Sequence, residues 1–170
     1  MKKSFILIIS MTILSAISIN AQINKIKFGN KSIIVKGKIF NEIKYSFSSS
    51  KNKYAAYFQI DKAKKALILT EISYEFENGK ANAVKFEIYT CLLAKINKKD
   101  SYNLGMEDEA VSGGKYWRLT LLSKGQGIDN LHFQKQTITT EDTATQRVNN
   151  VTINILQKAE AEKWLKFFTK

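Results

Sequence analysis

The chain has 170 residues, a formal net charge of +12, one cysteine and one histidine. A single cysteine, Cys91, excludes an internal disulfide, and with His132 as the only histidine a zinc site built from several histidines is excluded as well. Arg118 and Arg147 are the only arginines, so the arginine clusters typical of phosphate-backbone recognition are missing. We therefore expect no nucleic-acid partner, although the lysine excess allows weak association with anionic surfaces.

The N-terminus has the pattern of a cleavable signal peptide. Two lysines precede an apolar run over residues 5–14, and the small residue Ala21 marks a cleavage site. The run is too short for a membrane span, which needs about 20 apolar residues, so an uncleaved anchor is the less favoured alternative. We expect residues 1–21 to be removed and residues 22–170 to form one periplasmic or secreted domain, without a transmembrane segment after cleavage.

Apolar and polar residues alternate with a period of two through residues 39–93, which predicts strands. Asn78-Gly79 between two such runs is a strong hairpin signal, because both central turn positions need positive φ. The strand after this turn becomes apolar on both faces toward Leu93, which predicts a central strand covered on two sides. In the strand before the turn, the residues placed on the polar face are Glu71, Ser73, Glu75 and Glu77.

The second half of the chain is less regular until its end. Residues 97–115 are expected to form a loop with one short strand, and the polar, Thr-rich residues 137–146 an extended loop. Further strands are expected around residues 116–123, after residue 131 and at residues 151–155. We predict mainly β structure, an antiparallel bent sheet or barrel of about 7–9 strands.

The C-terminal segment changes from strand to helix period. A helix over residues 157–168 is predicted, with four apolar residues at i, i+3, i+4 and i+7. These residues are Ala161, Trp164, Leu165 and Phe168. An isolated helix of this length is marginal in water, so we expect its apolar face to pack on the β-sheet and close the domain.

The last strand and this helix, read together from Val151 to Phe168, resemble the end of pleckstrin-homology-like domains. In that family a final strand leads into a helix that carries a large apolar residue, here Trp164, and plugs one open end of a bent sheet. The resemblance implies a fold and no ligand, because the family's basic phosphoinositide motif has no counterpart here. A lipocalin-like barrel is the other resemblance, based on strand number and export, but the Gly-x-Trp of that family is missing.

Few residues suggest chemistry. Cys91 and His132 could form a nucleophile and base, although a buried thiol in a central strand is the favoured interpretation. Glu107-Asp108-Glu109 offers carboxylates for Ca²⁺, but consecutive acids cannot all face one ion without a turn. The aromatic residues that could form a carbohydrate or peptide platform are Tyr102, Tyr116 and Trp117, which we expect instead to pack in the core.

One modification signal completes the candidates. Asp142-Thr143-Ala144 resembles a short acceptor motif of bacterial periplasmic O-glycosylation. We expect no catalytic, cofactor-binding or metal-binding residues and no cofactor. The sequence favours an exported, non-enzymatic binding or scaffold module with an unidentified protein or small-molecule ligand. The alternatives are a lipocalin-like carrier of a small apolar ligand and a hydrolase that uses Cys91 or acidic residues.

Overall fold

The computed structural model describes residues 23–47, 50–111, 113–125 and 130–170, so the predicted signal peptide lies outside the described residues. These residues form mainly antiparallel β structure with one α-helix, as predicted. None of the described helices is long and apolar enough to span a membrane. The strands are β1 (Ile23–Phe28), β2 (Lys31–Lys36), β3 (Lys38–Phe47), β4 (Ser50–Asp61), β5 (Ala66–Glu77), β6 (Lys80–Leu92), β7 (Tyr102–Glu107), β8 (Lys115–Leu122), β9 (Phe133–Thr139), β10 (Thr143–Val148) and β11 (Asn150–Ile155).

The strands are divided among three sheets. The largest has the order β10-β9-β6-β5-β4-β3, a second has the order β11-β8-β7, and β1 and β2 form a separate hairpin. All described pairings are antiparallel, and most of them join strands that follow one another in the chain. The described sheets are not closed into a barrel, and their strands outnumber the 7–9 expected, so the barrel part of the prediction is not confirmed.

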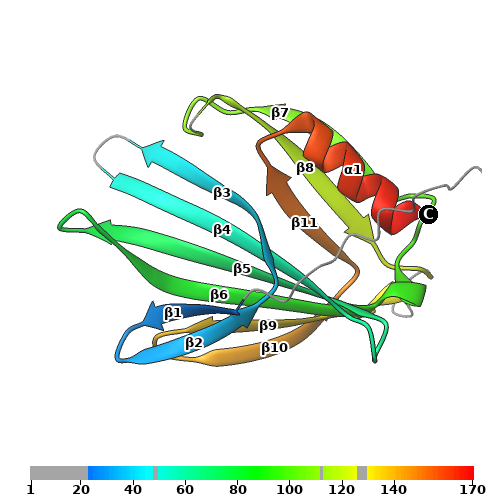
Figure 1. The fold of residues 1–170 in the computed structure, drawn as a ribbon, viewed down its shortest axis with the longest axis horizontal. Helices are drawn as coiled ribbons and strands as arrows, with labels where there is room; N and C mark the ends of the chain where they lie inside the picture. Colours follow the sequence, from blue (N-terminus) through cyan, green and yellow to red (C-terminus); the bar gives the residue numbers. More distant parts are fainter. Residues whose placement is uncertain (1–22, 48–49, 112, 126–129) are drawn as a thin grey trace, which may run out of the picture.

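The six-stranded sheet is the middle layer of the molecule. Figure 1 shows the three-stranded sheet and the helix on one side of it, and the β1–β2 hairpin on the other. Side chains alternate between the two faces of a strand, so Phe58 of β4 enters the core under the helix while Tyr57 packs against the hairpin. Because both faces are covered, β5 and β6 are apolar on both sides, as predicted for a central strand.

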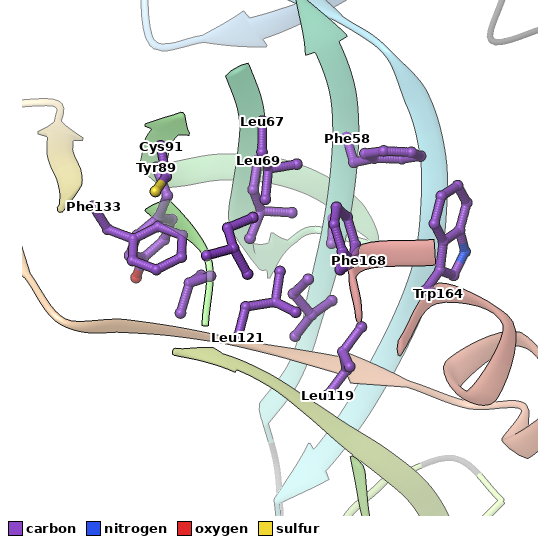
Figure 2. Packing of buried hydrophobic residues seen from close by; sticks show 14 of the residues in the cluster. Phe58, Leu67, Leu69, Tyr89, Cys91, Leu119, Leu121, Phe133, Trp164 and Phe168 are labelled. Carbon is purple, nitrogen blue, oxygen red and sulfur yellow. The ribbon is translucent and has the colours of Figure 1, made fainter. Parts of the chain in front are cut away.

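The helix α1 (Lys158–Thr169) begins within one residue of the predicted start and packs against β7, β8 and β11. Its buried residues are Ala161, Trp164 and Phe168, while Leu165 is half-buried. Trp164 is only 1 % exposed and meets Phe58 edge-on, with ring centroids 4.2 Å apart. Figure 2 shows the rings of Trp164 and Phe168 beside Phe58, with Leu119 of β8 close to Phe168.

Two of the local predictions have opposite outcomes. Asn78 and Gly79 have φ of 49° and 74°, and they join β5 to β6 as the hairpin signal predicts. In contrast, the Thr-rich segment predicted as an extended loop is a hairpin in which Thr143 of β10 pairs with Ile138 of β9. β10 is an edge strand that is exposed along nearly its whole length, so it needs no apolar face and gives no period-two signal.

Candidate functional site

The face of the six-stranded sheet under the three-stranded sheet carries a group of ionisable side chains at its centre. Glu71 of β5 is buried at 8 % exposure, and the hydroxyl of Tyr54 on β4 donates a hydrogen bond to its Oε1. Glu87 of β6 lies directly opposite Glu71 in the strand register. The prediction that Glu71 belongs to a polar face of its strand is therefore wrong, because that face carries the buried core residues Leu67 and Leu69.

Burial raises the pKa of the Glu71 carboxyl from 4.5 to about 7, since a desolvated carboxylate is disfavoured. The hydrogen bond from Tyr54 opposes this rise, the nearby carboxylate of Glu87 adds to it, and the ammonium groups of Lys135 and Lys85 oppose it. Glu71 is therefore close to half-protonated at neutral pH. A strongly perturbed pKa is common at functional sites, but structural networks produce it as well.

Glu87 is held by two lysines on the same face of the sheet. The Nζ of Lys135 lies 2.8 Å from Oε1 of Glu87, and the Nζ of Lys85 lies 3.5 Å from it. The Lys135 ammonium also lies 5.4 Å from the ring centroid of Tyr89, whose pKa rises to about 12 because the phenol is buried. Neither of the two described pockets is lined by Glu71, so we interpret the group as a polar network inside the fold.

The two residues considered as a nucleophile and base lie at one end of the same sheet. Cys91, at the end of β6, and His132, just before β9, both line a pocket of about 330 Å³. We call this the basic pocket, because its lining also contains Lys64, Lys95 and Arg147. It lies at the end of the six-stranded sheet at which β5 and β9 begin and β6 and β10 end.

The geometry does not make Cys91 a nucleophile. The thiol is 2 % exposed, and burial raises its pKa to about 11, although the ammonium of Lys95 lowers it in part. Its Sγ donates a weak hydrogen bond to the carbonyl of Leu92 at 3.4 Å. Among the described residues no hydrogen bond joins Cys91 to His132. A nucleophilic cysteine needs a thiolate and a base within hydrogen-bond reach. The described geometry favours a protonated thiol and provides no hydrogen bond from Cys91 to His132.

No protein family model matches this chain, and no curated protein or solved structure matches it either. The role of the basic pocket and of the Glu71 network must therefore be inferred from their own residues.

The acidic run considered for Ca²⁺ is spread over a strand end and a turn. Glu107 forms an ion pair with Lys115 at 3.2 Å, and Oδ1 of Asp108 accepts the N–H of Ala110. The part of the chain that the structure describes contains no group of three or more histidine, cysteine or acidic side chains arranged to hold a metal ion. Glu107 and Asp108 are thus used by local contacts of the strand end and the turn.

The aromatic residues considered as a platform do not come together. Tyr102 lies opposite Thr120 and Tyr116 opposite Met106, which places the two tyrosines four positions apart, or about 13 Å, along the sheet. Trp117 points to the other face, because neighbouring residues of a strand alternate. Tyr116 is buried, as predicted for the core, whereas Tyr102 is exposed at 47 %.

Thr143, the residue of the modification motif, is exposed at the first position of β10. It lines a groove of about 590 Å³ between the tips of the β1–β2 and β9–β10 hairpins, together with Phe28 and Ile138. The exposure of the residue is what a modification requires, and modification of Thr143 stays a prediction.

The sequence interpretation missed the basic pocket and the Glu71 network for different reasons. Lys64, Lys95 and Arg147 are distant in the sequence and meet only through the sheet order, so no local motif connects them. A signal for Glu71 was present: Leu67 and Leu69 have the same parity in β5 and are apolar, so the face that they share with Glu71 is a core face.

Proposed function

We propose that this chain is an exported, non-enzymatic β-domain that binds its ligand on its surface. The observation that supports this proposal is the packing between the six-stranded sheet and the layer formed by the three-stranded sheet and α1. That space is occupied by fully buried side chains, among them Phe58, Leu119, Phe133 and Trp164. A carrier of the lipocalin type needs a hollow interior, whereas a filled interior leaves only surface pockets for a ligand.

The finer fold assignment belongs to the same proposal. We infer that the two larger sheets act together as a bent sheet and that α1 plugs its open end, as in pleckstrin-homology-like domains. The position of Trp164 and Phe168 between the sheets supports this inference. The absence of enzymatic activity is inferred from the buried, protonated thiol of Cys91 and from its lack of a hydrogen bond to His132 among the described residues.

The distinction between surface binding and an internal carrier can be tested with an apolar probe. The purified domain is titrated with a fluorescent long-chain fatty-acid methyl ester, which has an acyl chain but no charge, while the fluorescence of its two tryptophans, Trp117 and Trp164, is followed. We expect no saturable binding, because the side chains around Trp164 leave no space for an acyl chain. Stoichiometric binding with quenching of Trp fluorescence would contradict the proposal and favour the carrier.

Export is tested by expressing the full chain in a bacterium and measuring the mass of the protein in the periplasmic fraction by mass spectrometry. We expect a mass that lacks residues 1–21. An Ile8→Arg variant serves as the control, because a charge within the apolar run should block export and leave the chain uncleaved in the cytoplasm. Wild-type protein found only at full length in the cell membrane would show that the N-terminus is an anchor.

A further inference from the structure

The basic pocket contains an ordered row of polar side chains from three adjacent strands. In the register of the sheet, Arg147 of β10 lies opposite Gln134 of β9, and Gln134 lies opposite Thr90 of β6. Residues directly opposite one another point to the same face of a sheet, so the row presents a guanidinium, an amide and a hydroxyl side by side. All three line the pocket.

Two lysines enter the pocket from rigid connections. Lys95 belongs to a 3₁₀ turn, Leu93–Lys95, that is tied to its surroundings by the bond from the N–H of Leu93 to the carbonyl of Lys65 and by that from the N–H of Lys124 to the carbonyl of Lys95. Lys64 lies in the β4–β5 turn, where its N–H donates to Oδ1 of Asp61. Hydrogen bonds therefore hold the backbones that carry these two lining lysines.

The charges of the pocket have one sign. Its described lining contains no aspartate or glutamate, and the ion pairs between described residues do not include Lys64, Lys95 or Arg147. Lys135, by contrast, forms an ion pair with Glu87. A concave site of one charge raises the local concentration of the opposite ion.

We propose that the basic pocket binds a small oxyanion, a phosphate ester or a carboxylate, and that Arg147 recognises its anionic group. The guanidinium fork matches both kinds of oxyanion, and Gln134 and Thr90 add hydrogen-bond donors beside it. A volume of about 330 Å³ is near the lower limit of ligand pockets and holds the equivalent of about ten water molecules, so the ligand is small. This inference rests on the proposed function, because it gives the binding domain its ligand class.

The pocket contains its own spectroscopic reporter. His132 is the only histidine of the chain and lines the pocket, so its ring resonances in a proton NMR spectrum are assigned without ambiguity. The folded protein is titrated with inorganic phosphate and, separately, with succinate, while sodium chloride keeps the ionic strength constant. We expect a saturable shift of the His132 resonances with at least one of the two anions.

Arg147→Gln is the decisive variant, because Arg147 is exposed on an edge strand and its loss should leave the fold intact. It should weaken binding by about tenfold or more, the expected effect of removing a charge-assisted hydrogen-bond donor. Lys80→Gln is the matched control: it removes one positive charge at the opposite end of β6 and should change the affinity by less than about twofold.

The outcomes separate the possible ligands and the two proposals. Saturable binding of phosphate alone would assign a phosphate ester as the ligand of the basic pocket, and saturable binding of succinate alone would assign a carboxylate. Saturable binding of both anions would show that the pocket recognises the negative charge shared by the two. The inference is overturned if neither anion saturates, or if Arg147→Gln and Lys80→Gln have the same affinity. Neither result contradicts the proposal of an exported domain with a filled interior, because that proposal is tested by the fatty-acid ester titration and the export experiment.

Discussion

The hydroxyl of Tyr54 on β4 donates a hydrogen bond to Oε1 of Glu71 on the neighbouring strand β5. The register places Tyr54 opposite Ser73 and Ala56 opposite Glu71, so the two residues are diagonal neighbours on one face of the sheet. The bond stabilises the ionised carboxyl, but burial has the larger effect and raises the pKa of Glu71 to about 7. The pair therefore makes the stability of the domain depend on pH near neutrality.

We expect Glu71→Gln to stabilise the protein above pH 7. Between about pH 4.5 and about pH 7 the folded state keeps a proton that the unfolded chain has released, so the free energy of unfolding of the wild type falls as pH rises. The loss is complete above the folded pKa and amounts to about 3 kcal/mol. Glutamine cannot ionise and still offers Tyr54 an acceptor, so the variant should escape this loss. Urea unfolding at a series of pH values measures the difference.

Glu75→Gln is the control for this experiment, because Glu75 lies further along β5 with the same parity but is exposed. Because Glu75 is exposed, this substitution should change the free energy of unfolding by no more than about 0.5 kcal/mol. If the Glu71→Gln and wild-type curves stay parallel from about pH 4 to about pH 8, the carboxyl of Glu71 titrates like an exposed one and its assigned burial is wrong.

Cys91 should react slowly with thiol reagents in the folded state. Burial raises its pKa from 9.0 to about 11, which alone lowers the thiolate fraction about 100-fold, and the side chain is nearly inaccessible. Labelling with a chromogenic disulfide should be at least that much slower in buffer than in denaturant. A Cys91→Ser, Leu104→Cys double variant provides an exposed thiol on β7 that should react rapidly. Equal rates for wild type and double variant would revive the nucleophile hypothesis.

The parts of the fold that the sequence predicted are those with a local signal. Asn78-Gly79 defines a hairpin because its backbone needs positive φ, and the spacing of Trp164 and Phe168 defines a helix face. The β9–β10 hairpin was missed because an exposed edge strand has no apolar face. The basic pocket was missed for a topological reason: β9 pairs with β6, and this non-consecutive pairing brings Arg147 close to residues more than fifty positions earlier.

Gly37→Ala should destabilise the domain more than any other Gly→Ala change with described geometry. Gly37 lies between β2 and β3 with φ of 126°, and a Cβ there would stand 2.3 Å from the carbonyl oxygen of Phe58. That oxygen belongs to the backbone of a central strand and cannot move aside, so strain and steric clash add. We expect a loss of about 3 kcal/mol or more in the free energy of unfolding, measured by urea denaturation.

Gly29→Ala is the matched control for backbone strain alone. Gly29 also has positive φ, at 54°, but no atom lies within 4 Å of a Cβ built on it. This variant should lose about 1 kcal/mol, the cost of a left-handed residue with a side chain. Similar losses for both variants would mean that the chain does not pass Phe58 as closely as the geometry indicates.

Trp164→Ala should show whether α1 closes the domain. Trp164 is buried against Phe58, and its Nε1 donates to Oε1 of Glu160 at 2.7 Å, one turn earlier in the helix. Truncation leaves a large cavity between the two sheets, which should cost about 3 to 5 kcal/mol in urea unfolding. Lys166→Ala, on the exposed side of the same helix, should change stability by no more than about 0.5 kcal/mol. If the two variants are equally stable, α1 is an exposed tail and the resemblance to pleckstrin-homology-like domains loses its basis.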